Sequence, residues 1–200
     1  MKKKKKNTNQ NLTQKQGQAL VALARHAIRE RVTRSAALDE AVVTLLQDKR
    51  LQEKQGTFVT LNQNGQLRGC IGTLTATESI VDSVKRNALN AALHDHRFSP
   101  ISPEEMDSID IEVSILTDPA PVEYTDGADL LSKLRPGTDG VIIRQGAARA
   151  TFLPQVWDQL SGPEEFLTHL CLKAGLAGEA WQTSRIEVLI YQVQYFEEKK

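Results

Sequence analysis

The sequence predicts an α+β protein built from a mixed, largely antiparallel sheet with flanking helices. The first reason is a hairpin pattern, in which the alternating strand residues Thr57–Leu61 run into the Asn-Gly turn of Asn62–Gly65. The second reason is that helical and strand periods follow one another without the regular strand–helix–strand order of a parallel sheet. The third is the composition, since 200 residues with 40% hydrophobic and 25% charged content suit one globular chain with a substantial core.

The amino-terminal half is expected to hold amphipathic helices on both sides of the hairpin. Thr13 and Gln16 form a capping-box pattern, and apolar residues at helical spacing behind it predict a helix to about Arg31. The stretch Thr33–Gln55 fits either a helix face or a wrapped loop. After the hairpin, Thr75–Glu78 forms a second capping-box pattern and predicts the start of the next helix.

The carboxyl-terminal half is expected to mix short helices with strands. Ser102–Glu105 is a helix start with proline in the first helical position. Ile109–Ile115 alternates apolar and polar residues, as a strand with one buried face does. Ile186–Phe196 is one long β-rich run that we expect to close the sheet. Between them we expect a short helix, a pair of strands and a capped helix, at Leu130–Leu134, Asp139–Leu153 and Ser161–Gly175.

Charge is distributed unevenly, although the net charge is +0. Lys2–Lys6 carry five positive charges, and without them acidic residues outnumber basic ones by five. We expect residues 1–11 to be a disordered basic leader and residues 12–200 to form a single domain. The acidic body makes nucleic acid an unlikely partner. With two free cysteines and neither a signal-peptide pattern nor an apolar run of membrane-spanning length, the sequence favours a cytoplasmic protein without membrane contact.

Leu67–Thr73 is the candidate functional segment, because it places a thiol between two glycines with an arginine two positions earlier. Strand alternation puts Arg68 and Cys70 on one face, and a nearby guanidinium favours the reactive thiolate. Gly69 and Gly72 are typical of a bulge, or of a place where a ligand or another backbone comes close. The alternative is that Cys70 acts as a small hydrophobe in a packed sheet surface.

The other residues that could carry chemistry are more simply explained by structure. His94 and His96 point apart on a helix, and no third ligand lies at metal-site spacing, so we expect no metal. Cys171 falls on the apolar stripe of a helix and is expected in the core. Glycine loops that bind nucleotides and nucleophile-elbow serines are lacking, so we expect no cofactor.

Several segments, in this order along the chain, resemble the AMMECR domain family. Leu67–Thr73, after the strand Phe58–Thr60, matches the hallmark heptapeptide of that family. The resemblance covers nearly the whole chain after the lysine leader and is closest to bacterial and archaeal members, including those of the AmmeMemoRadiSam system. It continues through Asp95–Pro100, Val113–Leu116, Gly137–Val141, Phe152–Val156, Glu165–Leu167, Leu170–Leu176 and Trp181.

The resemblance implies two unequal lobes with a cleft between them and the heptapeptide near that cleft. It also implies a modification pathway shared with a Memo-like protein, related in fold to extradiol dioxygenases, and a radical S-adenosylmethionine enzyme. The motif itself makes Cys70 the candidate catalytic residue. The candidate ligand-binding residues are Arg68, Gly69, Gly72, Thr73 and Arg97.

Two functions agree with these residues. The first is a cleft enzyme or enzyme subunit in which Cys70 is the nucleophile and Arg68 lowers its pKa and binds an anionic substrate. Its general base would be His94, His96 or Glu112, which the sequence does not bring near the thiol. The second is a non-catalytic adaptor module whose groove takes a peptide or small ligand, with Arg68 as the anion contact.

Overall fold

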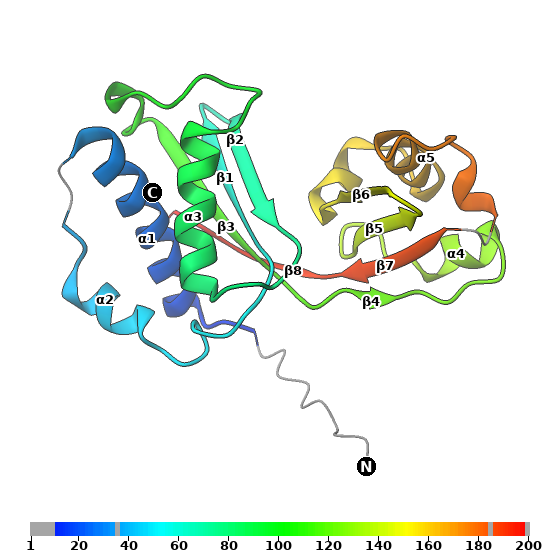
Figure 1. The fold of residues 1–200 in the computed structure, drawn as a ribbon, viewed down its shortest axis with the longest axis horizontal. Helices are drawn as coiled ribbons and strands as arrows, with labels where there is room; N and C mark the ends of the chain where they lie inside the picture. Colours follow the sequence, from blue (N-terminus) through cyan, green and yellow to red (C-terminus); the bar gives the residue numbers. More distant parts are fainter. Residues whose placement is uncertain (1–10, 35–36, 184–185, 199–200) are drawn as a thin grey trace, which may run out of the picture. The chain divides into compact units, whose positions relative to one another are not determined.

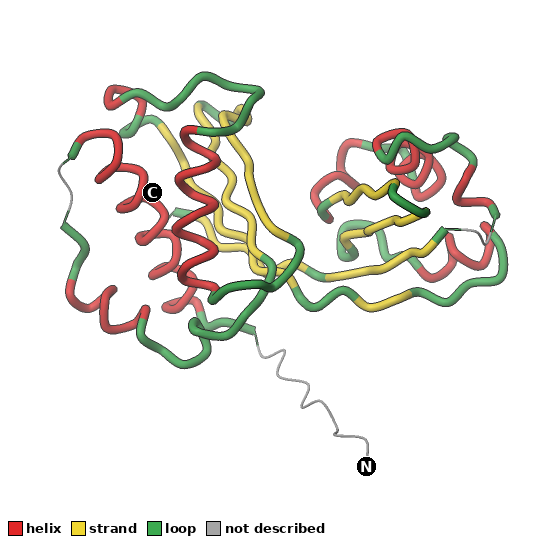
Figure 2. Tube along the Cα trace, in the orientation of Figure 1, coloured by secondary structure: helices red, strands yellow, loops and turns green. Residues whose placement is uncertain are grey.

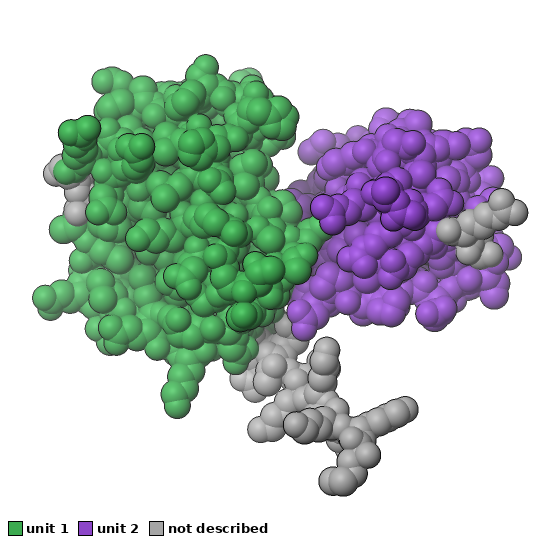
Figure 3. All heavy atoms as spheres, in the orientation of Figure 1, with its two compact units in different colours: residues 1–116, 194–200 green, residues 117–193 purple. Residues whose placement is uncertain are grey.

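The structure is a computed structural model that describes residues 11–34, 37–183 and 186–198. The chain divides into two compact units (Figure 3): unit 1 is Met1–Leu116 with Gln194–Lys200, and unit 2 is Thr117–Val193. Each unit has its own four-stranded sheet together with helices (Figure 2), which confirms the α+β class. Of the expected basic leader, residues 1–10 lie outside the described residues.

Unit 1 is a sheet with two long helices packed on one face (Figure 1). The sheet order is β2-β1-β3-β8, and β1 runs antiparallel to both β2 and β3. Alternate residues of β1 and β3, such as Val59 and Val113, are buried in the core beneath the helices. The elements are α1 (Gln14–Thr33), α2 (Glu40–Leu46), β1 (Thr57–Gln63), β2 (Gln66–Thr73), α3 (Ile80–Leu93), the 3-10 helix η1 (Pro103–Glu105), β3 (Ile109–Leu116) and β8 (Val193–Glu197).

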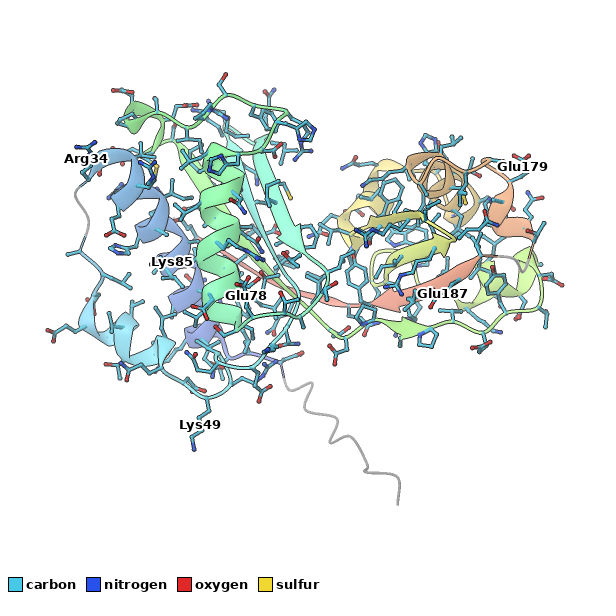
Figure 4. The ribbon with its side chains drawn as sticks, in the orientation of Figure 1. Arg34, Lys49, Glu78, Lys85, Glu179 and Glu187 are labelled. Atoms are coloured by element: carbon cyan, nitrogen blue, oxygen red, sulfur yellow. The ribbon has the colours of Figure 1, made fainter. Side chains whose placement is uncertain are left out.

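The first helix begins where the capping box predicts. The backbone N–H of Gln16 donates to Thr13 Oγ1 at 3.3 Å, and the N–H of Thr13 donates to Gln16 Oε1 at 2.8 Å. The helix ends at Thr33 and is capped by Arg34, labelled in Figure 4, whose φ of 56° is left-handed. The ambiguous stretch that follows contains the short helix α2.

The predicted start of the next helix was wrong. α3 begins at Ile80 and is capped by Ser79, whose Oγ accepts from the N–H of Asp82 at 3.1 Å. Ser79 also pairs with Lys54 in an isolated β-bridge, and the N–H of Ile80 donates to Glu53 O at 2.9 Å. These bonds tie the chain down just before the helix, so the capping pattern four residues earlier is not used.

The hairpin is confirmed, and it contains an irregularity. Asn64 and Gly65 have φ values of 53° and 76°, the left-handed pair that a tight two-residue turn needs. Leu61 pairs with Gly69, but Asn62 pairs with Leu67, so one residue of β2 is left over. That residue is Arg68, which forms a β-bulge, as the glycine-rich segment suggested. The bulge interrupts the alternation from which Arg68 and Cys70 were assigned to one face.

Unit 2 has a second sheet, of order β4-β7-β5-β6, with antiparallel pairing between neighbours. Its core contains Trp157 stacked on Phe166, with ring centroids 3.6 Å apart. Cys171 is fully buried in this core, as predicted. The elements are β4 (Ala120–Pro121), α4 (Gly127–Lys133), β5 (Gly140–Gln145), β6 (Ala148–Phe152), the 3-10 helices η2 (Pro154–Gln159) and η3 (Ala180–Gln182), α5 (Pro163–Lys173) and β7 (Glu187–Tyr191).

The expectation of one closing strand at Ile186–Phe196 was wrong. The run is split at Gln192 into β7, which belongs to the sheet of unit 2, and β8, which belongs to the sheet of unit 1. The N–H of Gln192 donates to Thr117 Oγ1 and its C=O accepts from the N–H of Thr117, both at 2.9 Å. These bonds replace ladder pairing at Gln192.

In the part of the chain that the structure describes, no helix has both the length and the apolar character to span a membrane.

Candidate functional site

The heptapeptide lies on β2, an edge strand of the sheet in unit 1. An edge strand leaves backbone groups without a ladder partner. The loop after α3 supplies partners for two of them. The N–H of Cys70 donates to Asp95 Oδ2 at 2.9 Å, and the C=O of Cys70 accepts from Arg97 Nη2 at 3.2 Å. The heptapeptide and the Asp95–Pro100 segment therefore meet at the backbone of Cys70.

Asp95 and Arg97 form the centre of this junction. The carboxylate of Asp95 is almost completely buried and accepts from Arg97 Nε at 2.9 Å and Arg97 Nη2 at 2.7 Å. The guanidinium of Arg97, together with the backbone N–H of Cys70, holds the pKa of the Asp95 carboxyl well below its usual range. The side chain of Arg97 is nevertheless 45% exposed. Asp95 thus fixes the orientation of a guanidinium that still reaches solvent.

The thiol of Cys70 is half-buried, and its hydrogen-bond partner is Thr60, whose Oγ1 donates to Sγ at 3.4 Å. Burial raises the pKa of this thiol, which the Thr60 hydroxyl and the charge of Arg97 only partly oppose. The cation that acts on the thiol is therefore Arg97, whereas the sequence suggested Arg68. A raised pKa keeps the thiol protonated near neutral pH and makes it a weak nucleophile.

Arg68 is engaged in a different set of contacts. Its Nε and Nη2 donate to the two oxygens of Glu105 at 2.8 and 3.2 Å, and its Nη1 donates to Ser99 O at 2.9 Å. This bidentate pair lowers the pKa of the Glu105 carboxyl. The Phe98 ring lies near both guanidiniums, 5.9 Å from Arg68 Cζ and 5.4 Å from Arg97 Cζ. Arg68 therefore holds η1 and the Phe98 loop against the bulge of β2.

The candidate bases are placed differently from one another. Thr60 pairs with Cys70 on one side and with Glu112 on the other, so these three residues form one row across β2, β1 and β3. Burial raises the pKa of Glu112, which accepts from Ser114 Oγ at 2.9 Å. His94 and His96 are exposed, and no hydrogen bond within the described residues joins their imidazoles to Cys70. Nor does the described chain hold a group of three metal-ligating side chains.

The remaining predicted ligand residues have contacts within the fold. A Cβ on Gly69 would lie 2.3 Å from Ala91 O, so the missing side chain lets α3 approach β2. A Cβ on Gly72 would lie 2.1 Å from the ring of Phe58, which covers this glycine from the next strand. Thr73 Oγ1 accepts from Arg86 Nη2 at 2.9 Å. The ligand roles proposed for these residues, and the cleft between lobes, stay predictions.

Asp95 and Thr60 were not predicted from the sequence as members of the site, nor was Glu105 as the partner of Arg68. The Asp-x-Arg spacing after the end of α3 was a usable signal, since two residues so placed can form an ion pair. What the sequence did not disclose is that β2 is an edge strand, and only that makes Asp95 the partner of a backbone N–H. We call Cys70, Thr60, Asp95, Arg97 and Phe98 the Cys70 site.

The chain is similar to known proteins along nearly its whole length. A family model described as AMMECR1 matches residues 21–196. A curated protein of Methanothermobacter thermautotrophicus is 40% identical over 194 residues, which cover 94% of this chain and 96% of that protein. A curated protein of Methanopyrus kandleri is 39% identical over 197 residues, covering 94% and 91%. The crystal structure of the uncharacterized protein PH0010 from Pyrococcus horikoshii matches with a TM-score of 0.82 and 34% identity, over 94% of each chain.

Proposed function

The chain belongs to the AMMECR1 family, and we propose that it is a non-catalytic recognition module whose Cys70 site binds an anionic group. The main support for this proposal is that the guanidinium of Arg97 is held in one orientation and still reaches solvent. Its Nε and Nη2 are held by the buried carboxylate of Asp95, while the side chain remains 45% exposed. A guanidinium that is already oriented loses little conformational entropy when it binds a carboxylate or phosphate.

The surroundings of Arg97 fit a binding role. The Phe98 ring offers an apolar face beside the guanidinium, and the half-buried thiol of Cys70 adds a small, neutral surface. Such a combination suits a small molecule or peptide that carries an anionic group next to an apolar one. Arg68, the anion contact expected from the sequence, has both edges of its guanidinium occupied by Glu105 and Ser99. In this proposal Arg97 is the anion contact and Arg68 is a positioning residue.

A second candidate is an enzyme or enzyme subunit that uses Cys70. The row Cys70–Thr60–Glu112 favours it, because a thiol and a carboxyl with raised pKa lie on one line of the sheet. Perturbed groups of this kind are common in active sites. The raised thiol pKa speaks against it, since catalytic cysteines have depressed values. In either case we propose that the chain works in a modification pathway with a Memo-like protein and a radical S-adenosylmethionine enzyme.

The test is a binding measurement with the two proposed partners, purified and immobilised one at a time. We expect the wild-type chain to bind at least one of them with micromolar or better affinity. Arg97→Ala should weaken that binding about tenfold, the effect of losing one well-ordered charged contact. Arg144→Ala is the matched control, because Arg144 is 49% exposed and also paired with a carboxylate, and it should leave the affinity unchanged. No complex with either partner would overturn the proposed partnership.

A further inference from the structure

The outer edge of β2 lies open beside the Cys70 site. Among the described strands, β2 is the last of its sheet and pairs with β1 alone (Figure 1). Opposite residues of an antiparallel pair alternate between those that bond to the partner strand and those whose N–H and C=O point away from it. Cys70 is of the second kind, because its N–H and C=O bind Asp95 and Arg97 of a loop outside the sheet.

The backbone of Gly72 points the same way as that of Cys70. The pairing of β2 with β1 has no register shift between Gly69 and Thr73, so the alternation is unbroken there. Gly72, two positions after Cys70, therefore directs its N–H and C=O outward. Neither group has a hydrogen-bond partner among the described residues, and Gly72 is partly exposed. The edge thus offers one donor and one acceptor in the geometry that an added strand needs.

The loop after α3 limits how far an added strand can extend. The outward groups of Cys70 are already bound by Asp95 and Arg97, so regular pairing in that direction ends at Gly72. In a strand that runs antiparallel to β2, the direction from Gly72 toward Cys70 leads to the carboxyl end. These two residues are about 7 Å apart along the strand. The last one or two residues of such a peptide therefore reach Arg97.

The charge at this end of the edge favours a terminal carboxylate. Asp95 orients the guanidinium of Arg97, whose side chain is 45% exposed. A strand parallel to β2 would bring its amino terminus, a cation, to the same place, and the two charges would repel each other. An antiparallel strand brings a carboxylate, which forms strong hydrogen bonds with a guanidinium. The charge of Arg97 therefore favours the antiparallel direction.

Phe58 favours an apolar side chain at the position opposite Gly72. Residues opposite each other on neighbouring strands place their side chains on the same face of the sheet. On that face the ring of Phe58 fills the space above Gly72 and lies 2.1 Å from where a Cβ would be. Phe58 is only partly buried, so its ring can contact a side chain of the added strand. An aliphatic or aromatic residue suits this contact.

We propose that the ligand of the Cys70 site is the carboxyl-terminal segment of a protein, which adds to β2 as a short antiparallel strand. Its backbone exchanges two hydrogen bonds with Gly72, and its terminal carboxylate binds Arg97. The side chain opposite Gly72 contacts the ring of Phe58. The carboxylate contact at Arg97 rests on the proposed function, whereas the strand addition rests on the open edge of β2.

The test uses pentapeptides that carry fluorescein at the amino end and a free carboxyl terminus, with the last three residues varied among alanine, valine, leucine and phenylalanine. Fluorescence anisotropy with the full chain should show saturable binding of at least one peptide. Amidation of its carboxyl terminus should raise the Kd at least tenfold, and Arg97→Ala should abolish the difference between acid and amide. Arg144→Ala, at a 49% exposed arginine of unit 2, is the control and should preserve that difference. Absence of saturable binding for every peptide would overturn the inference.

N-methylation of the peptide backbone, one residue at a time, separates strand addition from anion binding. At the residue opposite Gly72 it removes a donor and should raise the Kd at least tenfold, whereas the N–H groups of the neighbouring residues point away from β2 and should tolerate it. If every position tolerates methylation and Arg97→Ala still weakens binding, only the strand addition is refuted. If one position is sensitive but acid and amide bind alike, the carboxylate contact at Arg97 is refuted, and the proposed function with it.

Discussion

Asp95 accepts a hydrogen bond from the backbone N–H of Cys70 at 2.9 Å, and this bond joins the loop after α3 to an edge strand of unit 1. Through the same carboxylate, Arg97 is brought to the C=O of Cys70. The junction does two things at once. It satisfies backbone groups that the sheet leaves unpaired, and it holds one guanidinium in a fixed, partly exposed position.

Removing the carboxylate should therefore destabilise unit 1. We expect Asp95→Ala to lower the free energy of unfolding by about 2–4 kcal/mol, because it leaves the N–H of Cys70 without its acceptor and Arg97 without its carboxylate partner. Urea unfolding followed by circular dichroism measures this. Asp107→Ala, which removes a carboxylate that is 90% exposed and pairs with Arg29, is the control and should shift the midpoint far less. Equal shifts would show that the Asp95 junction has no special role in stability.

The same carboxylate should make stability depend on pH. The pKa of Asp95 is lower in the folded protein than its ordinary value near 3.9, so its stabilising effect is present above about pH 4 and lost as the pH falls below that. The stability difference between wild type and Asp95→Asn should be largest at neutral pH and should shrink between about pH 4 and pH 2. Urea unfolding at several pH values tests this. A difference that stays constant with pH would contradict it.

At Glu112 the ionised carboxylate should lower the stability of the folded protein, the opposite of its effect at Asp95. Burial raises the pKa of its carboxyl, so the ionised form is less favourable in the folded protein than in the unfolded chain. Above the ordinary glutamate pKa of about 4.3, Glu112→Gln should therefore be more stable than wild type, and the gain should fade at lower pH. Glu179→Gln is the control at an exposed glutamate, labelled in Figure 4, and should change little. A loss of stability in Glu112→Gln at pH 7 would refute the assignment.

The thiol of Cys70 should react slowly with alkylating reagents. Burial raises its pKa, so the rate of iodoacetamide labelling at pH 7 should be several-fold below that of free cysteine and should rise with pH. Because the charge of Arg97 lowers this pKa, Arg97→Gln should slow labelling further at pH 7. Peptide mass spectrometry separates Cys70 from Cys171, which is fully buried and should stay unlabelled. Labelling of Cys70 faster than free cysteine would instead indicate an activated nucleophile.

Gly69 should not tolerate a side chain. Its Cβ would lie 2.3 Å from Ala91 O, a backbone atom of α3 that cannot move without shifting the helix. We expect Gly69→Ala to destabilise the protein by about 2 kcal/mol, as overpacking commonly does. Gly162→Ala is the control, because its Cβ would meet nothing within 4 Å, and its effect should be small. Thermal unfolding of both variants measures this, and equal midpoint temperatures for the two variants would contradict the prediction.

Features that depend on local sequence could be predicted well. The turn at Asn64 and Gly65 and the cap at Thr13 follow from neighbouring residues, and the structure confirms both. The alternation of β3 is confirmed as far as Val113, whereas Ser114, expected on the open face, is buried. Cys171 could likewise be assigned to the core from its helical spacing alone. The glycines predicted a bulge in this segment, but they did not show that it falls at Arg68 or that it shifts the pairing of β2 with β1.

Features that depend on distant partners could not be predicted. Nothing near Gln192 shows that Thr117 binds it and ends the strand there. One continuous strand was therefore expected, whereas the run is divided between two sheets. Nothing near Cys70 shows that burial outweighs a neighbouring guanidinium, so the direction of its pKa was misjudged. At Gln192 the deciding contact comes from Thr117, 75 positions away, and at Cys70 the deciding effect is the burial that the whole fold imposes on the thiol.

The most direct test of the recognition role is to compare the partner affinities of Cys70→Ser and Arg97→Ala. Both variants alter the same site, but one removes the sulfur and the other the oriented guanidinium. If the site recognises an anionic group through Arg97, Arg97→Ala should bind the partner about tenfold more weakly, and Cys70→Ser should lose far less affinity because it keeps the oriented guanidinium. Full affinity in Arg97→Ala together with loss of binding in Cys70→Ser would contradict it.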